Sequence, residues 1–390
     1  MKVFLINPPS YKGIDFVREG RCAERTSAFS YSLPPHTLMS IATLMRKGNF
    51  QPKITDCIEE HINFRELEHE IKKENPGMII INTTTPTIHG DLKVGRIAKK
   101  YGIFSALVGT FPSVMDEWCL RNSKADAVVR NEPEITSLEL AKRISRQKNL
   151  KNVRGVTFRE GNRIIRNKPR PFERDMEKFR VEARDLVNNR LYKMPFSNDP
   201  VAMVAPSRGC PFNCTFCITQ NYYGNRLRSR KAECIFEEIR DVYNSQGIKD
   251  IALWAESFLI DKKGIRELMT LLKGEKMDIN LYITSRVDSV DYPLMKRMKS
   301  SGFRSIGFGV ESGSQEILDR CRKGITTAQS RDAINSAKKA GLQTMCHMIF
   351  GLPGETPETM RASLNFALKT DPDFYNFYTA IPYPGTEFYR

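Results

Sequence analysis

Short apolar runs alternate with amphipathic stretches through the first third of the chain. A continuous apolar run between turn residues is typical of a strand buried on both faces, whereas apolar residues three or four positions apart are typical of a helix. We expect strands over Val3–Ile6, Lys53–Cys57, Met78–Ile81, Phe104–Val108 and Ala127–Val129. Helices are expected over Leu38–Met45, Phe64–Lys73 and about 90–101. This alternation predicts an α/β domain with helices on both faces of a parallel sheet, whose ligands lie beyond the carboxyl ends of the strands.

The alternation breaks after residue 142 and resumes near residue 200. Two strand-like segments flank Glu160-Gly161-Asn162 and predict a hairpin. In the second half we expect strands over Val201–Ala205, Ile251–Trp254, Asn280–Thr284, Ser305–Val310, Thr344–Phe350 and Phe374–Ile381. Six strand–helix units predict a partial barrel whose chemistry lies at the carboxyl rim of the strands. We therefore expect a first domain over 1–142, a basic connector with a small hairpin over 143–199, and a second domain over 200–390.

Hydropathy predicts no membrane span, because no apolar run approaches the roughly 20 residues that a bilayer requires. The apolar run within Met1–Pro9 is shorter than the h-region of a secretory signal, which needs about 7–15 residues. We interpret this segment as a strand and expect a cytoplasmic protein.

The net charge of +16 is concentrated in one segment, residues 140–190, which holds 16 Lys and Arg against 6 Asp and Glu. The segment contains no recognisable nucleic-acid-binding motif, and its aromatic residues are sparse. A solvated basic connector is therefore favoured over a surface for nucleic acid. The same charge would also suit docking of an acidic electron-transfer protein.

Nine cysteines in a chain without an export signal argue against a disulfide framework. Six of them stand alone, and we interpret these as small buried hydrophobic residues: Cys22, Cys57, Cys119, Cys234, Cys321 and Cys346. The other three are clustered.

Cys210, Cys214 and Cys217 form a Cys-x3-Cys-x2-Cys loop directly after the first strand expected in the second domain. Three thiolates can ligate three irons of a [4Fe–4S] cluster and leave the fourth iron open. A purely electron-carrying cluster takes four cysteines, and tetrahedral zinc takes a fourth Cys or His. The loop contains neither, so its spacing favours the open cluster over zinc.

With Phe216 directly before the last cysteine, this loop resembles that of the radical S-adenosylmethionine (SAM) superfamily. The resemblance implies that SAM chelates the open iron and is cleaved by an electron to methionine and a 5′-deoxyadenosyl radical. It places Phe216 near the adenine. Further SAM contacts are implied after later strands, at Ala255, Glu256, Ser257, Glu311 and Ser312. Glycine-containing strand ends at 350–356 and 381–386 complete the pattern.

The first domain resembles the Rossmann-like (flavodoxin-like) cobalamin-binding domain of one radical SAM subclass, the B12-dependent methyltransferases. The matching positions, which the resemblance makes candidate cobalamin contacts, are Pro8, Pro9, Thr83, Thr84, Thr85, Gly109, Thr110 and Glu132. The threonines and Gly109 fall where related domains hold the nucleotide tail. Thr110 departs from the usual second glycine.

The Asp-x-His-x-x-Gly motif that supplies a histidine to cobalt in many cobalamin domains is absent. Its place is taken by Asn7-Pro8-Pro9-Ser10-Tyr11, and His89 is the nearest candidate in the sequence. We therefore expect base-off cobalamin without a histidine ligand. A Rossmann-like regulatory or nucleotide module remains the alternative, although no G-x-G-x-x-G follows Ile6.

Together these resemblances imply a radical SAM enzyme that methylates an unactivated carbon of an unknown organic substrate. The alternatives are a cobalamin-dependent cyclase or rearrangement enzyme without methyl transfer, and a truncated module that only binds corrinoid or SAM. An electron donor such as flavodoxin or ferredoxin is implied. Because members of the family usually extend beyond the point matched by Arg390, we expect either a truncated product or a barrel completed by another chain.

Overall fold

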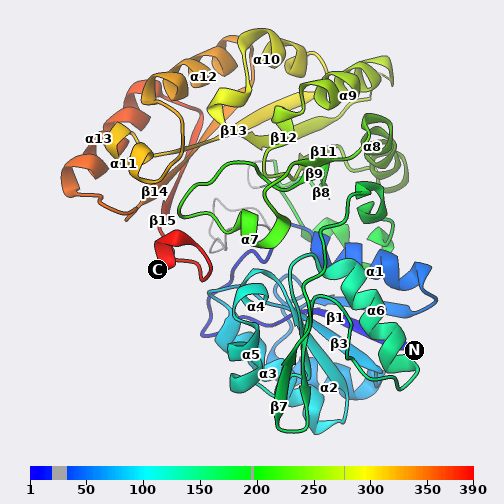
Figure 1. Cartoon of the computed structure of the whole chain (residues 1–390). Coiled ribbons are helices and arrows are strands. Elements are labelled where there is room, and N and C mark those ends of the chain that lie inside the picture. The colour runs from blue at the N-terminus through cyan, green and yellow to red at the C-terminus, as the bar shows by residue number, and fades with distance from the viewer. Residues whose placement is uncertain (20–32, 195–196, 276) are drawn as a thin grey trace. The chain divides into compact units, whose positions relative to one another are not determined.

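A computed structural model describes residues 1–19, 33–194, 197–275 and 277–390 (Figure 1). Cys22, one of the single cysteines, lies outside the described residues. The chain divides into two compact units, each described separately below. Unit 1 comprises Met1–Glu173, Lys178–Pro200 and Asn221–Tyr223, and unit 2 comprises Arg174–Glu177, Val201–Gln220 and Gly224–Arg390. None of the described helices is long and apolar enough to span a membrane.

Unit 1 is built on a seven-stranded sheet in the order β2-β1-β3-β4-β5-β6-β7 (Figure 1). Its strands are β1 (Lys2–Asn7), β2 (Gln51–Asp56), β3 (Met78–Asn82), β4 (Phe104–Val108), β5 (Ala127–Val129), β6 (Val156–Glu160) and β7 (Arg163–Arg166). The first five are parallel. The parallel sheet expected from the apolar runs is thus confirmed.

Helices cover both faces of this sheet. Successive side chains of a strand point to opposite faces, so a continuous apolar strand presents apolar residues to helices on both sides. They are α1 (His36–Lys47), α2 (Phe64–Glu74), α3 (Ile88–Lys100), α4 (Thr110–Val114), α5 (Asp116–Asn122) and α6 (Pro133–Ser145). In β1, Val3 and Leu5 pack in one buried cluster with residues of α1 and α6. The alternate residues Phe4 and Ile6 pack in a second cluster with residues of α2, α3 and α5.

The predicted hairpin forms, and it extends the first sheet. Strand β6 pairs antiparallel with β5, and β7 pairs antiparallel with β6. Short 3-10 turns follow at η1 (Met176–Phe179), η2 (Arg184–Leu186) and η3 (Asn189–Leu191). The sequence indicated a hairpin here but not that it would pair with β5.

Unit 2 is built on a six-stranded parallel sheet in the order β15-β14-β13-β12-β11-β8, consistent with the predicted partial barrel (Figure 1). Its strands are β8 (Val201–Val204), β11 (Asp250–Leu253), β12 (Asn280–Ser285), β13 (Phe303–Glu311), β14 (Gln343–Phe350) and β15 (Phe374–Thr379). A small antiparallel pair, β9 (Ser207–Arg208) and β10 (Arg228–Ser229), follows β8. The helices that lie wholly in unit 2 are α8 (Ala232–Gln246), α9 (Lys262–Glu275), α10 (Tyr292–Lys299), α11 (Gln315–Arg320), α12 (Thr327–Lys339) and α13 (Pro357–Thr370). The short helix α7 (Thr219–Tyr223) begins in unit 2, and its last three residues are assigned to unit 1. Further 3-10 turns are η4 (Phe258–Ile260), η5 (Val287–Ser289) and η6 (Glu387–Tyr389).

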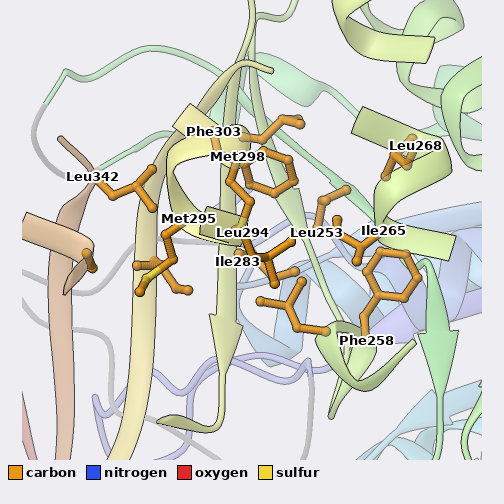
Figure 2. Close-up of a cluster of buried hydrophobic side chains, with 14 of the residues drawn as sticks. Leu253, Phe258, Ile265, Leu268, Ile283, Leu294, Met295, Met298, Phe303 and Leu342 are labelled. Carbon is orange, nitrogen blue, oxygen red and sulfur yellow. The ribbon is translucent and has the colours of Figure 1, made fainter. Parts of the chain in front are cut away.

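The main core of unit 2 lies between one face of this sheet and the helices (Figure 2). Leu253 and Ile283 reach it from strands, and Leu268 and Met298 reach it from α9 and α10. Along β12 and β14 the intervening side chains are half-buried on the opposite face. We call this second, more polar surface the inner face.

Candidate functional site

The three clustered cysteines lie on the loop between β9 and α7 of unit 2. Gly209 opens the loop with a positive φ of 87°, a conformation that favours glycine. The amide of Cys210 donates to the carbonyl of Gly224 at 3.2 Å, and that of Cys217 to the carbonyl of Cys214 at 3.1 Å. These bonds fold the loop back on itself, with Cys210 buried and Cys214 and Cys217 half-buried.

All three thiols are free, and two have hydroxyl neighbours. The Cys210 sulfur lies 3.1 Å from the Ser257 hydroxyl oxygen, and the Cys217 thiol donates to the Thr219 hydroxyl oxygen at 3.2 Å. Within the described parts of the chain, no three His, Cys, Asp or Glu side chains converge on a point that would hold a single metal ion. A cluster takes one thiolate per iron, so its ligands do not share one such point.

Two cations that the sequence did not single out lie beside this loop. The Arg286 guanidinium stacks 3.6 Å from the ring centroid of Phe212, and the buried Lys323 ammonium donates to Glu311 at 2.6 Å. Burial raises the pKa of the Cys214 thiol, and the charges of Lys323 and Arg286 oppose that increase. Positive charge near thiols stabilises thiolates, the form that binds iron.

Glu311 ends β13 in a left-handed conformation, with φ at 67°. Such a backbone is uncommon for a residue other than glycine and is concentrated at functional sites. The pairing of β13 with β14 shifts between Gly309 and Glu311. A side chain at Gly309 would come within 2.7 Å of the Glu311 carboxylate and 3.0 Å of the Lys323 ammonium. The glycine therefore leaves room for this buried ion pair.

The other predicted SAM contacts differ in their surroundings. Glu256 and Ser257 are buried beyond β11, next to half-buried Ala255, and Ser257 is the neighbour of Cys210. Phe216 packs against a small cluster that includes Cys321. Ser312 is fully buried and its hydroxyl bonds with Ser363. The role of all these residues as SAM contacts stays a prediction.

Most of the single cysteines are buried as expected. Cys57, Cys119, Cys321 and Cys346 are buried, and burial raises the pKa of Cys346 to about 12 and that of Cys321 to about 11. Cys234 is half-buried on α8.

In unit 1, the predicted cobalamin contacts lie at the carboxyl ends of four adjacent strands, β1, β3, β4 and β5. Gly109, with φ at 119°, abuts the backbone of Thr83 so closely that an added Cβ would lie 2.1 Å from the Thr83 carbonyl oxygen. The amide of Thr83 in turn donates to the carbonyl of Val108. Only glycine fits at Gly109, so the ends of β3 and β4 form one tightly joined edge.

A buried ion pair organises the threonine loop of this edge. Arg18 and Asp91 have side-chain exposures of 3% and 0%, and their charged atoms lie 2.9 Å apart. Asp91 accepts a hydrogen bond from Thr87 at 2.5 Å, and the Thr87 hydroxyl lies 2.9 Å from that of Thr84. Arg18 also donates to the carbonyls of Pro8 and Asn82, and it therefore ties the ends of β1 and β3 together.

A row of polar side chains crosses the same edge. Asn82 donates to Asn7 at 2.9 Å, Asn7 donates to Asp56 at 3.1 Å, and buried Tyr192 donates to Asp56 at 3.1 Å. Burial raises the pKa of Asp56 to about 6, against the opposing effect of the Asn7 hydrogen bond. The contacts among these side chains were not predicted, because the residues become neighbours only through the strand order.

The remaining predicted contacts also lie along this edge. Pro8 and Pro9 are buried after β1, Thr85 is half-buried, Thr110 begins α4, and Glu132 precedes α6 and accepts from the amide of Glu173. Exposed His89 packs edge-on against Trp118. The expectation that cobalt receives no histidine stays a prediction.

Both sets of residues fit the groups that the sequence implied. Three free thiols on one loop, next to buried cations, suit an anionic iron–sulfur cluster. A sheet edge lined by threonine and asparagine, with Gly109 packed against Thr83, offers hydrogen-bonding groups to a large polar cofactor. The class defined by these features is a two-unit α/β protein that combines a three-thiol loop with a separate ligand-binding sheet edge.

Family models agree with this division. A model of the radical SAM superfamily matches residues 204–367, and a model of the B12 binding domain matches residues 26–141. An uncharacterized methyltransferase of Pyrococcus horikoshii is 33% identical, over 100% of this chain and 83% of the relative. The anaerobic magnesium-protoporphyrin IX monomethyl ester cyclase of Cereibacter sphaeroides is 24% identical, over 92% of this chain and 60% of the relative.

A solved structure has the same fold. The radical SAM methyltransferase TsrM of Kitasatospora setae, with cobalamin and a [4Fe–4S] cluster bound, superposes with a TM-score of 0.78 at 18% identity, covering 99% of this chain and 76% of that chain. The chain belongs to the cobalamin-binding radical SAM enzymes. Its cofactors are an iron–sulfur cluster, SAM and cobalamin.

Proposed function

We propose that this enzyme transfers a methyl group to an unactivated carbon of an organic substrate. The observation that carries the proposal is the combination, in one chain, of the free three-thiol loop and the cobalamin-type edge at Gly109 and Thr83. The name of the Pyrococcus horikoshii relative, a methyltransferase, agrees with it. When bound, the cofactors supply a carbon-centred radical from SAM and a transferable methyl group from cobalamin.

The thiolates of Cys210, Cys214 and Cys217 would hold the cluster. Arg286, which pairs with Asp288, and Lys323, which pairs with Glu311, would lie beside these thiolates. The SAM contacts would be Phe216, Ala255, Glu256, Ser257, Glu311 and Ser312. Ser257 and Glu311 are themselves buried, and exclusion of water from the SAM site would protect a radical from side reactions.

The cobalamin contacts would be Pro8, Pro9, Thr83, Thr84, Thr85, Gly109, Thr110 and Glu132. The Arg18–Asp91 pair would hold the threonine loop in place for the cofactor. We assign residues 1–142 to the cobalamin-binding domain, 143–199 to the connector and 200–390 to the radical SAM domain.

A reductant and an organic substrate are required by enzymes of this family, and we propose an acidic flavodoxin or ferredoxin as the electron donor. Exposed basic residues between positions 140 and 170 would form its docking surface: Lys142, Arg146, Lys148, Lys151, Arg154, Arg163, Arg166 and Lys168.

Product analysis tests the proposed reaction. The reconstituted enzyme, with reductant, SAM, cobalamin and substrate, should form S-adenosylhomocysteine together with 5′-deoxyadenosine. Formation of 5′-deoxyadenosine without S-adenosylhomocysteine would instead assign the chemistry of a cyclase, as in the Cereibacter sphaeroides relative. Formation of neither product would leave a protein that only binds its cofactors.

A further inference from the structure

A cluster of hydrogen-bonding side chains lies on the inner face of the unit 2 sheet, across β14 and β15. The His347 Nδ1 atom and the Tyr378 hydroxyl are 2.9 Å apart, and the Asn376 amide donates to the same hydroxyl at 3.0 Å. The rings of His347 and Tyr378 stack, with centroids 5.8 Å apart. His347 and Asn376 are partners in the strand register, so the cluster is fixed by rigid strands.

Gly307 on β13 lets this cluster lie close against the strand backbone. A side chain there would come within 2.9 Å of the His347 Nε2 atom and 3.1 Å of the Thr284 hydroxyl oxygen. The lack of a side chain at Gly307 thus lets the imidazole edge and a hydroxyl from β12 approach the β13 backbone. His347, Asn376, Tyr378 and Thr284 are all half-buried.

The cluster lies next to the strand end proposed to bind SAM. His347 is the register partner of Gly309, whose missing side chain makes room for Glu311 and Lys323. A polar group on this face is therefore adjacent to the proposed radical-forming site. A few polar side chains held in fixed positions on a half-buried surface suit recognition of a ligand, because they can orient it through hydrogen bonds.

We propose that His347, Asn376, Tyr378 and Thr284 form the substrate-recognition site, and that the substrate is a polar molecule bringing a hydroxyl or carboxylate group to His347 and Tyr378. This inference rests on the proposed function, because it names the substrate class for that site. Imidazole, amide and hydroxyl groups both donate and accept hydrogen bonds, and they would orient such a group. A wholly hydrocarbon substrate would form no hydrogen bonds with these groups.

The test measures stimulation of SAM cleavage by extracts of the cells in which the protein occurs, partitioned into an aqueous and a hexane fraction. Each fraction is added anaerobically to holoenzyme, and 5′-deoxyadenosine formation is expressed relative to each variant's own rate without extract. The aqueous fraction should stimulate the wild-type enzyme. Stimulation should fall about tenfold in His347→Ala and in Tyr378→Phe, as expected for loss of a hydrogen bond to a substrate.

Tyr375→Phe is the matched control, because Tyr375 is exposed on the same strand and outside the recognition site. It should retain full stimulation. The small change in Tyr378→Phe keeps the test valid if His347→Ala folds poorly, and iron content and thermal unfolding are measured for each variant. Stimulation by the hexane fraction alone, no stimulation by the aqueous fraction, or equal stimulation in all variants would overturn the proposal.

The same measurements distinguish failure of the proposed methyl transfer from failure of the proposed recognition site. If the proposed function is wrong, S-adenosylhomocysteine is absent while the pattern of 5′-deoxyadenosine stimulation across the variants is kept. If only the recognition site is wrong, S-adenosylhomocysteine is formed and His347→Ala and Tyr378→Phe form as much of it as Tyr375→Phe.

Discussion

At the scale of single residues, the three loop cysteines lead to a direct prediction about iron content and SAM cleavage. Anaerobic reconstitution should give about four irons per chain, the content of one [4Fe–4S] cluster. Cys214→Ala should lose most of this iron and all SAM cleavage, because a cluster with two remaining thiolates is poorly held. Iron and sulfide analysis, with 5′-deoxyadenosine measured in parallel, checks the prediction.

Cys234→Ala is the control, since this half-buried cysteine lies on α8 rather than on the loop. It should keep both iron and SAM cleavage. Zinc in place of iron after anaerobic preparation, or full SAM cleavage by Cys214→Ala, would refute the assignment.

The cysteine loop could be found from the sequence because its signal is local: three residues within one short segment. Arg286 and Lys323 could not, because they come from distant parts of the chain and meet the loop only in the folded unit. The same holds for the row from Asn82 through Asn7 to Asp56, which depends on strand order. For Ser312, the sequence pattern predicted a contact with SAM but could not reveal that its hydroxyl bonds with Ser363.

At the scale of elements, the Arg18–Asp91 pair joins the loop after β1 to α3. Arg18→Met would leave the Asp91 carboxylate buried without its partner, which costs about 3–5 kcal/mol for a buried pair. We expect that loss in the free energy of unfolding, measured by denaturant titration. Cobalamin binding, followed by absorbance, should weaken as well because Thr84 loses its support.

Arg121→Met is the matched control, because its pair with Glu117 is exposed on one helix. Such pairs contribute about 0–1 kcal/mol, so stability should change little. The double variant Arg18→Met/Asp91→Leu removes both charges and should recover part of the loss. Equal stability of Arg18→Met and Arg121→Met would contradict the role given to the buried pair.

Most elements followed from the apolar pattern, because strands buried on both faces are continuous apolar runs. Strand β4 begins and ends at the predicted residues, and β3 ends one residue beyond its predicted end. Strand β15 ends at Thr379, two residues before the predicted Ile381. The tiny strands β9 and β10 were missed, since two residues carry no periodicity.

At the scale of the whole molecule, the net charge of +16 should govern how an acidic electron donor approaches. Screening shortens the reach of exposed charges to about 8–10 Å at 0.1–0.15 M salt. If the basic segment docks flavodoxin or ferredoxin, the rate of cluster reduction by that donor should fall steeply with salt. Stopped-flow absorbance measures this rate.

A triple variant with Arg154, Arg163 and Lys168 changed to Gln should flatten the salt dependence. A control triple with Lys263, Lys299 and Arg331 changed to Gln alters the net charge equally at exposed positions of unit 2. Reduction that is insensitive to salt, or equal effects of the two triples, would leave the basic segment as a solvated connector.

The β6–β7 hairpin has a consequence for the protein's behaviour at high concentration. A parallel sheet ending at β5 would present that strand's unpaired amides and carbonyls to other chains, and exposed edges of this kind template aggregation. The hairpin covers β5 and places a short strand at the border, with Arg163 and Arg166 at its two ends. Charged residues on a short edge strand discourage further pairing. The hairpin thus prevents other chains from pairing with β5 and so opposes aggregation at this edge of the sheet.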